Sequence, residues 1–231
     1  MSVPIWLVRG DPSTQDRIAG RALRKGDIKV VNGLEWEMAV TATTGSRRSL
    51  GPDAPSLPDG FLRLALELPD AVWAAPDYFT LGNFSFVSAK FRDAVGAPPT
   101  VLHYLPLDLR TGRERARTQD YKLLRVTAHQ PAMDCERSVY ELGSVTPPGR
   151  PTTSFIRFVN SYVLRDDLVP ASEIFWDDVL LSSLLAVDAL AERVMQAGCT
   201  GIRFRDPATR GVGNGVIRYR TATGIAEETL G

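Results

Sequence analysis

Carboxylates are concentrated between positions 166 and 192, in a run that contains no lysine or arginine. Paired carboxylates can transfer protons or hold a divalent cation. The run comprises Asp166, Asp167, Glu173, Asp177, Asp178, Asp188 and Glu192. Asp188 and Glu192 are better explained by a helix that starts near them, because acidic residues are favoured at helix starts. The pairs Asp166/Asp167 and Asp177/Asp178 therefore define one hypothesis, a metal-dependent hydrolase.

An aromatic pair, Phe175 and Trp176, comes directly before Asp177 and Asp178. An apolar anchor beside negative charge suits a surface that binds a basic protein partner. We therefore expect the partner-binding residues to be Asp166, Asp167, Glu173, Phe175, Trp176, Asp177 and Asp178. Carboxylates are also common in solvated loops, so a surface without a binding role is the alternative.

The other side chains that commonly react do not form motifs. His103 and His129 have no second histidine, cysteine or carboxylate at the spacing of metal ligands. Cys199 follows a helix-ending glycine and is expected to be buried, and Cys135 has acidic neighbours, which raise a thiol pKa. The sequence contains no phosphate-binding glycine loop and no nucleophile motif. It predicts a protein that is not an enzyme, with no catalytic residue, no metal site and no cofactor.

Charge and composition limit the classes of partner. The 231 residues include 27 basic and 27 acidic side chains, so no overall field selects nucleic acid or an anionic membrane. Four arginines lie between Arg110 and Arg117 without interleaved aromatic residues, which favours a solvated hairpin tip over a nucleic-acid site. Two cysteines, no signal-peptide pattern and no run long enough to cross a bilayer predict a cytoplasmic protein. Its oligomeric state is left open.

Hydrophobic periodicity predicts more strands than helices. Strands are expected at 3–8, 62–68, 101–109, 121–127 and 155–159, with a hairpin that joins 201–205 to 216–220. The strand at 101–109 would place His103 on its apolar face. Irregular loops are expected at 41–60 and 143–153, where glycine, proline and serine gather. We expect one α+β domain over residues 1–231, with a largely antiparallel sheet.

Two similar segments, 86–95 and 185–194, lie 99 positions apart. Each opens with apolar residues, continues through a capping residue (Ser88 or Asp188) and then repeats large apolar residues four positions apart. This pattern predicts two repeated units, each a strand followed by a short helix.

The second half of the chain contains Ile174-Phe175 and the ending Ala-Gly-x-x-Gly-Ile-x-Phe at 197–204, and the first half contains Pro76-Asp-Tyr-Phe79 and the 86–93 segment. In these features the chain resembles a bacterial immunity-protein family whose members accompany polymorphic toxins. The similarity covers roughly residues 72–206, and the usual serine before the second helix is Val187 here.

The resemblance implies a protein that neutralises a cognate toxin by direct, stoichiometric binding. Several relatives are associated with nuclease-type toxins, whose basic clefts would suit the acidic 166–178 segment. The alternatives are the metal-dependent hydrolase and a protein-interaction module with a different partner.

Overall fold

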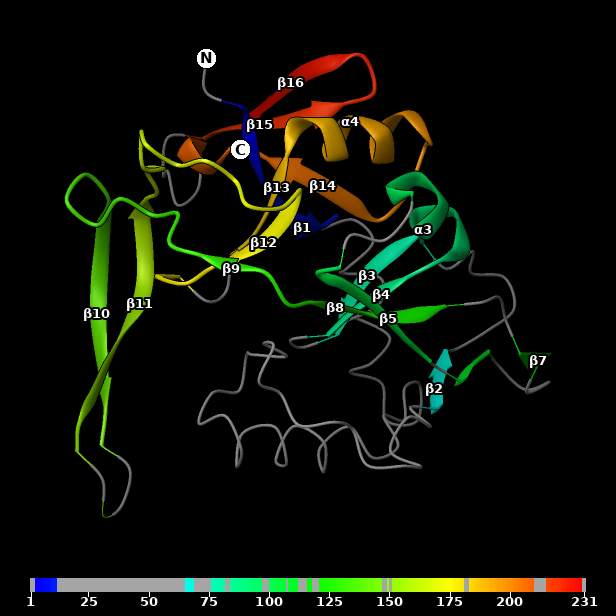
Figure 1. The fold of residues 1–231 in the computed structure, drawn as a ribbon, viewed down its shortest axis with the longest axis horizontal. Helices are drawn as coiled ribbons and strands as arrows, with labels where there is room; N and C mark the ends of the chain where they lie inside the picture. Colours follow the sequence, from blue (N-terminus) through cyan, green and yellow to red (C-terminus); the bar gives the residue numbers. More distant parts are fainter. Residues whose placement is uncertain are drawn as a thin grey trace.

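The computed structural model describes residues 3–11, 65–68, 76–81, 84–96, 100–106, 108–111, 116–117, 121–146, 149, 151–180, 183–209 and 215–229. Within these ranges the chain forms four β-sheets and two α-helices (Figure 1). Most neighbouring strands run antiparallel. The expected α+β class with a largely antiparallel arrangement is therefore confirmed. The predicted loop at 41–60 lies outside the described residues, and the single domain over 1–231 remains a prediction.

The largest sheet has seven strands in the order β16, β15, β14, β1, β13, β12, β9. They are β1 (Ile5–Gly10), β9 (His129–Gln130), β12 (Ile174–Asp177), β13 (Leu184–Val187), β14 (Ile202–Arg205), β15 (Val216–Thr221) and β16 (Gly224–Thr229). Within this sheet β9 and β12 pair in parallel, and the other neighbouring strands pair antiparallel. All four residues of β13 and the first four of β1 are buried, because both strands are central and covered on both faces. The predicted opening strand and the pairing of 201–205 with 216–220 are confirmed.

A second sheet has the antiparallel order β3 (Tyr78–Leu81), β4 (Phe84–Val87), β8 (Lys122–Val126) and β5 (Leu102–Pro106). The predicted strand at 101–109 is divided between β5 and β6 (Asp108–Thr111). Strand β6 belongs to a third sheet with β2 (Ala65–Leu68) and β7 (Ala116–Arg117). The expected face of β5 was also wrong, because Leu102 is buried and His103 is exposed.

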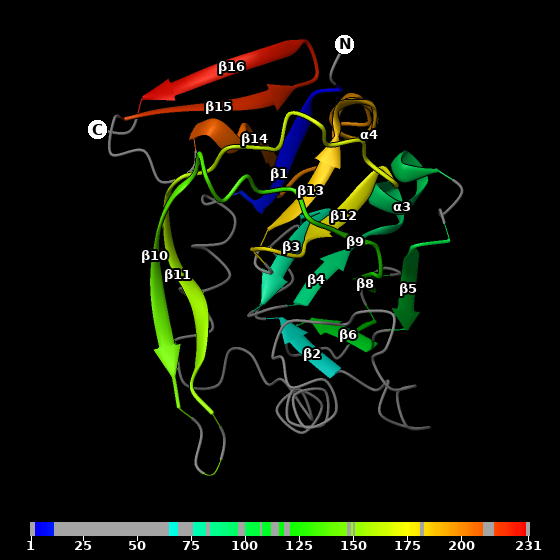
Figure 2. The same ribbon diagram turned by 60° about the vertical axis from the view of Figure 1, so that its left-hand side comes forward.

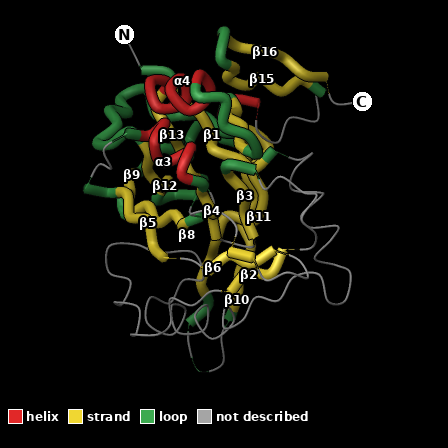
Figure 3. The backbone as a smooth tube through the Cα atoms, turned by 90° about the vertical axis from the view of Figure 1, so that its right-hand side faces the viewer, coloured by secondary structure: helices red, strands yellow, loops and turns green. Residues whose placement is uncertain are grey.

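Two short helices, α3 (Ala89–Val95) and α4 (Asp188–Gln196), lie side by side (Figure 3). The Ser88 hydroxyl caps α3 by accepting a hydrogen bond from the Phe91 N–H at 3.2 Å. The expected cap at Asp188 was wrong: Val187 occupies the cap position, and Asp188 instead accepts a hydrogen bond from the Trp6 indole at 2.7 Å. Each helix directly follows a strand, but the equivalence of the two segments as repeats remains a prediction. A 3-10 turn (Pro207–Thr209) follows β14.

The main hydrophobic core joins the two larger sheets to the helices. It contains buried side chains from the seven-stranded sheet (Trp6, Ala186, Phe204), from the four-stranded sheet (Tyr78, Val87, Leu124) and from the helices (Phe91, Leu190, Val194). These elements therefore share one apolar interior and position one another.

The two sets of segments that carry the family resemblance, 76–93 and 174–204, meet in this shared core. Asp77 accepts hydrogen bonds from the Ser88 hydroxyl at 2.7 Å and from the Thr200 N–H at 2.9 Å. Gly201 has φ +80°, and a Cβ there would overlap the Tyr78 carbonyl oxygen and lie 2.5 Å from the Pro76 Cβ. The glycine is required because the backbone of one half passes directly against the other.

The remaining two strands, β10 (Val139–Val145) and β11 (Thr153–Ser161), form a two-stranded sheet of their own, here called the ribbon. Figures 1 and 2 show the ribbon extending away from the larger sheets. The expected loop at 143–153 was too long, since residues 143–145 and 153 pair within the ribbon.

Candidate functional site

Asp177, one of the expected binding residues, is completely buried. Its Oδ1 accepts hydrogen bonds from the N–H groups of Ala132 and Val179, each at 3.0 Å, and its Oδ2 accepts one from the Tyr162 hydroxyl at 2.7 Å. The Met133 N–H lies 3.5 Å from the same Oδ1. These donors come from three separate segments, so Asp177 ties the segments together. This burial does not favour a direct contact with a partner, and the expectation that the Asp177 carboxylate contacts one remains a prediction.

The aromatic pair is also turned inward. Phe175 is 1% exposed and packs against Leu7 and Leu185. Trp176 is partly buried against the main core. Both faces of β12 are covered, so consecutive side chains of this strand are enclosed on either side. Phe175 therefore offers no surface to a partner, and Trp176 offers only part of its ring.

Asp166 and Asp167 line an open hollow of about 610 Å³. The hollow is formed where the segment after β9 meets the segment after β11. Met133 and Leu164 form an antiparallel bridge between them, and the Asp134 N–H donates to the Val163 carbonyl at 2.8 Å. The lining residues are Pro131, Met133, Asp134, Cys135, Glu136, Arg137, Arg165, Asp166, Asp167 and Val179.

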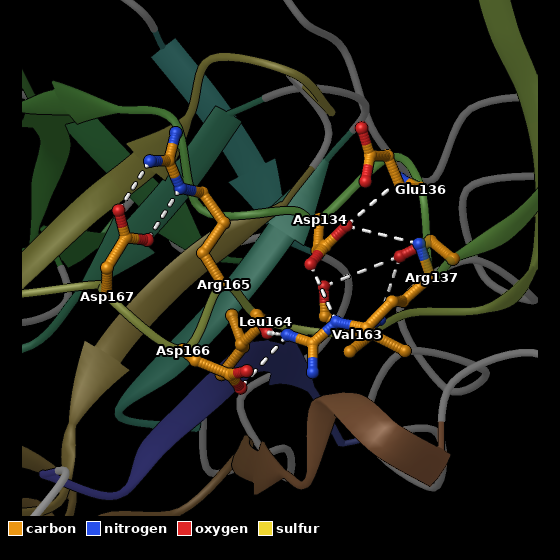
Figure 4. A network of polar contacts seen from close by, with 9 residues as sticks. Asp134, Glu136, Arg137, Val163, Leu164, Arg165, Asp166 and Asp167 are labelled. Atoms are coloured by element: carbon orange, nitrogen blue, oxygen red, sulfur yellow. Dashed lines mark hydrogen bonds and ion pairs between the residues drawn. The ribbon is translucent and has the colours of Figure 1, made fainter.

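Two arginines organise the rim of this hollow (Figure 4). The Arg137 guanidinium donates to Asp134 Oδ2 at 2.7 Å, to the Leu164 carbonyl at 2.9 Å and to Asp166 Oδ1 at 2.9 Å. Arg165 binds Asp167 through two hydrogen bonds, at 3.0 and 2.8 Å. All these groups are solvent-accessible, so the pairs shape the surface more than they stabilise the fold.

The rim nevertheless carries an excess of negative charge. Four carboxylates (Asp134, Glu136, Asp166, Asp167) face two guanidinium groups (Arg137, Arg165). The hydrogen bond from the Arg137 side chain is the main cause that lowers the pKa of Asp134, and hydrogen bonds from backbone N–H groups lower it further. The hydrogen bond from Arg165 lowers the pKa of Asp167. These two carboxylates therefore stay ionised at neutral pH, and the hollow favours a cationic group.

The other two expected acidic residues lie apart from Asp166 and Asp167 and have partners of their own. Glu173 binds Arg193 of α4 through two hydrogen bonds, at 3.0 and 2.8 Å, and so connects β12 to the helix. Asp178 is exposed, and its Oδ1 lies 3.2 Å from His129 Nδ1. The structure therefore brings together only Asp166 and Asp167 at the hollow, with Asp134 and Glu136, which the sequence reasoning did not select.

The geometry does not favour the metal-dependent hydrolase. Both oxygens of Asp177 are used by donors within the fold, and the Asp166 and Asp167 carboxylates are paired with arginines. In the described part of the chain, no three histidine, cysteine or acidic side chains gather as a metal site requires. The expected burial of Cys199 is confirmed, and burial, with the nearby Asp77 charge, raises its pKa to about 11.

The ribbon carries exposed apolar side chains that the sequence reasoning missed. Of the nine large hydrophobic side chains exposed among the described residues, five belong to it. They are Val139, Leu142, Val145, Phe155 and Phe158, which are 56%, 66%, 51%, 47% and 52% exposed. Apolar positions in this segment indicated a strand, but not that one face of the strand would be left uncovered.

The pairing register assigns these residues to faces. Phe155 lies opposite Gly143, and Phe158 lies opposite Glu141. The register shifts at Val139/Tyr140 and at Glu141/Leu142, and the extra residues, Asn160 and Arg157, lie on β11. The alternation of β10 is therefore kept, and Val139 and Val145 share this face with both rings. The other face is partly covered: Tyr140, Ile156 and Val159 pack against Met133, Tyr162 and Leu180. The first face, with Val139, Val145, Phe155 and Phe158, is the outer face of the ribbon.

Comparison with known proteins adds a family assignment. A family model described as an immunity protein family, Imm11, matches residues 61–209, which is more than half of the chain. A search of curated proteins finds no significant match. No helix within the described ranges is long and apolar enough to cross a membrane.

Proposed function

The chain belongs to the Imm11 immunity protein family, and we propose that it neutralises a cognate toxin by binding the toxin directly in a stoichiometric complex. The family match over residues 61–209 is the observation that carries this proposal. It agrees with the resemblance found in the sequence, which spans nearly the same residues. The producing cell's cytoplasm is the proposed compartment.

The surface supports a binding role and not a catalytic one. The exposed Asp166 and Asp167 carboxylates of the hollow are paired with arginines, and the ribbon presents uncovered apolar side chains. A binding protein needs a rigid scaffold and a complementary surface, and needs no reactive group. The shared core and the Asp177 network supply that rigidity.

A nuclease is the class of toxin that we propose for the partner. Nucleases bind polyanions and therefore present basic surfaces. The excess negative charge around the hollow, including Asp166 and Asp167, is complementary to such a surface.

Co-expression with the toxin encoded beside this gene tests the proposal. We expect the protein to restore growth of cells that produce the toxin, and to form a 1:1 complex measured by size-exclusion chromatography with light scattering. The purified toxin should degrade DNA or RNA, and one equivalent of this protein should stop that degradation. No complex at micromolar concentration, with no protection of the cells, would contradict the proposal.

A further inference from the structure

The ribbon and the acidic hollow are continuous in space. The segment that lines the hollow ends at Arg137 and enters β10 at Val139, and β11 leaves the ribbon at Ser161 just before Leu164 and Arg165. A hydrogen bond joins the two segments at this point, from the Val163 N–H to the Ser138 hydroxyl at 2.9 Å. The hollow therefore lies at the root of the ribbon, and one partner can reach both.

The root of the ribbon is held firmly in place. Tyr140, Ile156 and Val159 pack against the cluster that contains Tyr162, and the Tyr162 hydroxyl donates to the buried Asp177 carboxylate. A surface that is already ordered loses little conformational entropy when a partner binds. The outer face is thus both uncovered and pre-organised near its base.

The outer face has the composition of a binding hot spot. Phe155 and Phe158 are the only aromatic residues among the large exposed hydrophobic side chains of the described part of the chain. The Arg157 guanidinium lies 5.0 Å from the Phe158 ring centroid, so the ring is flanked by a polar group. Buried aromatic anchors with a polar rim typify the centre of protein interfaces. An isolated two-stranded hairpin is only marginally stable in water, so a partner on this face would also stabilise the ribbon.

Size and charge then define the partner. The nine residues of β11 span about 30 Å at about 3.3 Å per residue, a length suited to a standard protein interface. At the root, the carboxylates outnumber the arginines by two. The complementary surface is therefore apolar over the ribbon and basic over the hollow.

From these observations we infer that the outer face of the ribbon and the hollow at its root form the contact surface for the toxin, which presents an apolar patch flanked by lysine or arginine. This inference rests on the proposed function. It replaces Phe175 and Asp177 as contact residues and retains Asp166 and Asp167.

Two variants and two matched controls test the inference with the toxin domain encoded beside this gene. The first variant, Phe155→Ser with Phe158→Ser, is compared with Ile225→Ser, a 63% exposed residue on the β15–β16 hairpin. The second, Asp166→Lys, is compared with Glu227→Lys, since both acidic residues are exposed and paired with an arginine. Affinity and association rate are measured at low and high salt, and thermal melting checks folding.

We expect the double phenylalanine variant to lose at least about 30-fold in affinity, the effect of one aromatic hot spot. Asp166→Lys should slow association at low salt, with a smaller difference at high salt. Both controls should bind within twofold of the wild type. In the wild-type complex, amide hydrogen exchange should slow in residues 139–145 and 153–161 and stay unchanged in residues 216–229.

Failure of this inference is distinguishable from failure of the proposed function. If the wild type binds and protects but the double variant binds equally well, the contact surface is elsewhere. Two further results for the double variant would also overturn the inference. If the wild type self-associates and the double variant does not, while both bind the toxin equally, the ribbon binds a second copy of this chain. If the melting temperature of the double variant falls sharply, the two rings pack within this chain. If the wild type itself neither binds nor protects, the proposed function is refuted.

Discussion

Replacement of Asp177 by alanine is expected to destabilise the protein by about 4 kcal/mol. The substitution removes the acceptor for the Tyr162 hydroxyl and for the Ala132 N–H, two buried donors. Each buried donor left without a partner costs about 2 kcal/mol. The Val179 N–H also loses its acceptor, but it is only partly buried and can bind water.

Equilibrium unfolding in urea measures this change, and a thermal melt should show a Tm lower by about 12 °C. Asp177→Asn is expected to cost less, about 1.5 kcal/mol, because the amide oxygen still accepts from the backbone and the Tyr162 hydroxyl can accept from the amide nitrogen. Asp178→Ala provides the matched control, because its side chain is exposed and the change should stay within about 0.5 kcal/mol.

An Asp177→Ala variant that unfolds within about 1 kcal/mol of the wild type would refute this reasoning. It would show that the carboxylate does not organise the three segments and would return Asp177 to the set of candidate contact residues. If the reasoning holds, Asp177→Asn should also bind the toxin within twofold of the wild type, because the side chain is not accessible.

Three further predictions concern the junction and the aromatic pair. Gly201→Ala should destabilise the fold by at least about 3 kcal/mol in urea unfolding, because the new Cβ would overlap the Tyr78 carbonyl oxygen and the alanine would have to adopt a positive φ. Its control is Gly149→Ala, at φ +72° with open space around it, which should show only the conformational cost of about 1–2 kcal/mol. Burial of Asp77 acts to raise its pKa, but hydrogen bonds from Ser88 and Thr200 outweigh burial and lower it. The ionised carboxylate therefore stabilises the fold fully above the unfolded-state pKa of about 3.9, and this stability is lost as the pH falls through the lower folded-state pKa. Asp77→Asn should remove this pH dependence and so flatten the acid side of a plot of unfolding free energy against pH. Trp176→Ala should lower the unfolding free energy by about 2–3 kcal/mol while toxin affinity stays within twofold, which a binding assay on the folded variant would check.

Local periodicity was sufficient to predict much of the fold. Residues four positions apart, Phe91 with Val95 and Leu190 with Val194, predicted two helices, and the structure buries all four side chains. The expected strand at 121–127 is β8, and it lies beside β5, which is part of the expected strand at 101–109. These features depend on neighbours in the chain, so the sequence alone contains them.

The candidate site could be predicted only in part. The acidic run drew attention to Asp166 and Asp167, which do line the hollow, but it gave Asp177 and Asp178 the same weight. The structure separates them, because one is completely buried and its neighbour is exposed. The donors that enclose Asp177 come from residues 15 and 45 positions away in the chain, at Tyr162 and Ala132. No local pattern reports contacts at that separation.

By itself, the sequence determined the family, the α+β class and the positions of the main strands and helices, because hydrophobic spacing and short glycine motifs act locally. The tertiary structure alone decided which carboxylates face solvent and that Val139, Val145, Phe155 and Phe158 remain uncovered. Exposure is a property of what packs against a strand, and the ribbon pairs with no other strand among the described residues. The hydrophobic pattern of an apolar strand is therefore the same in the sequence whether its face is buried in the core or left exposed to a partner.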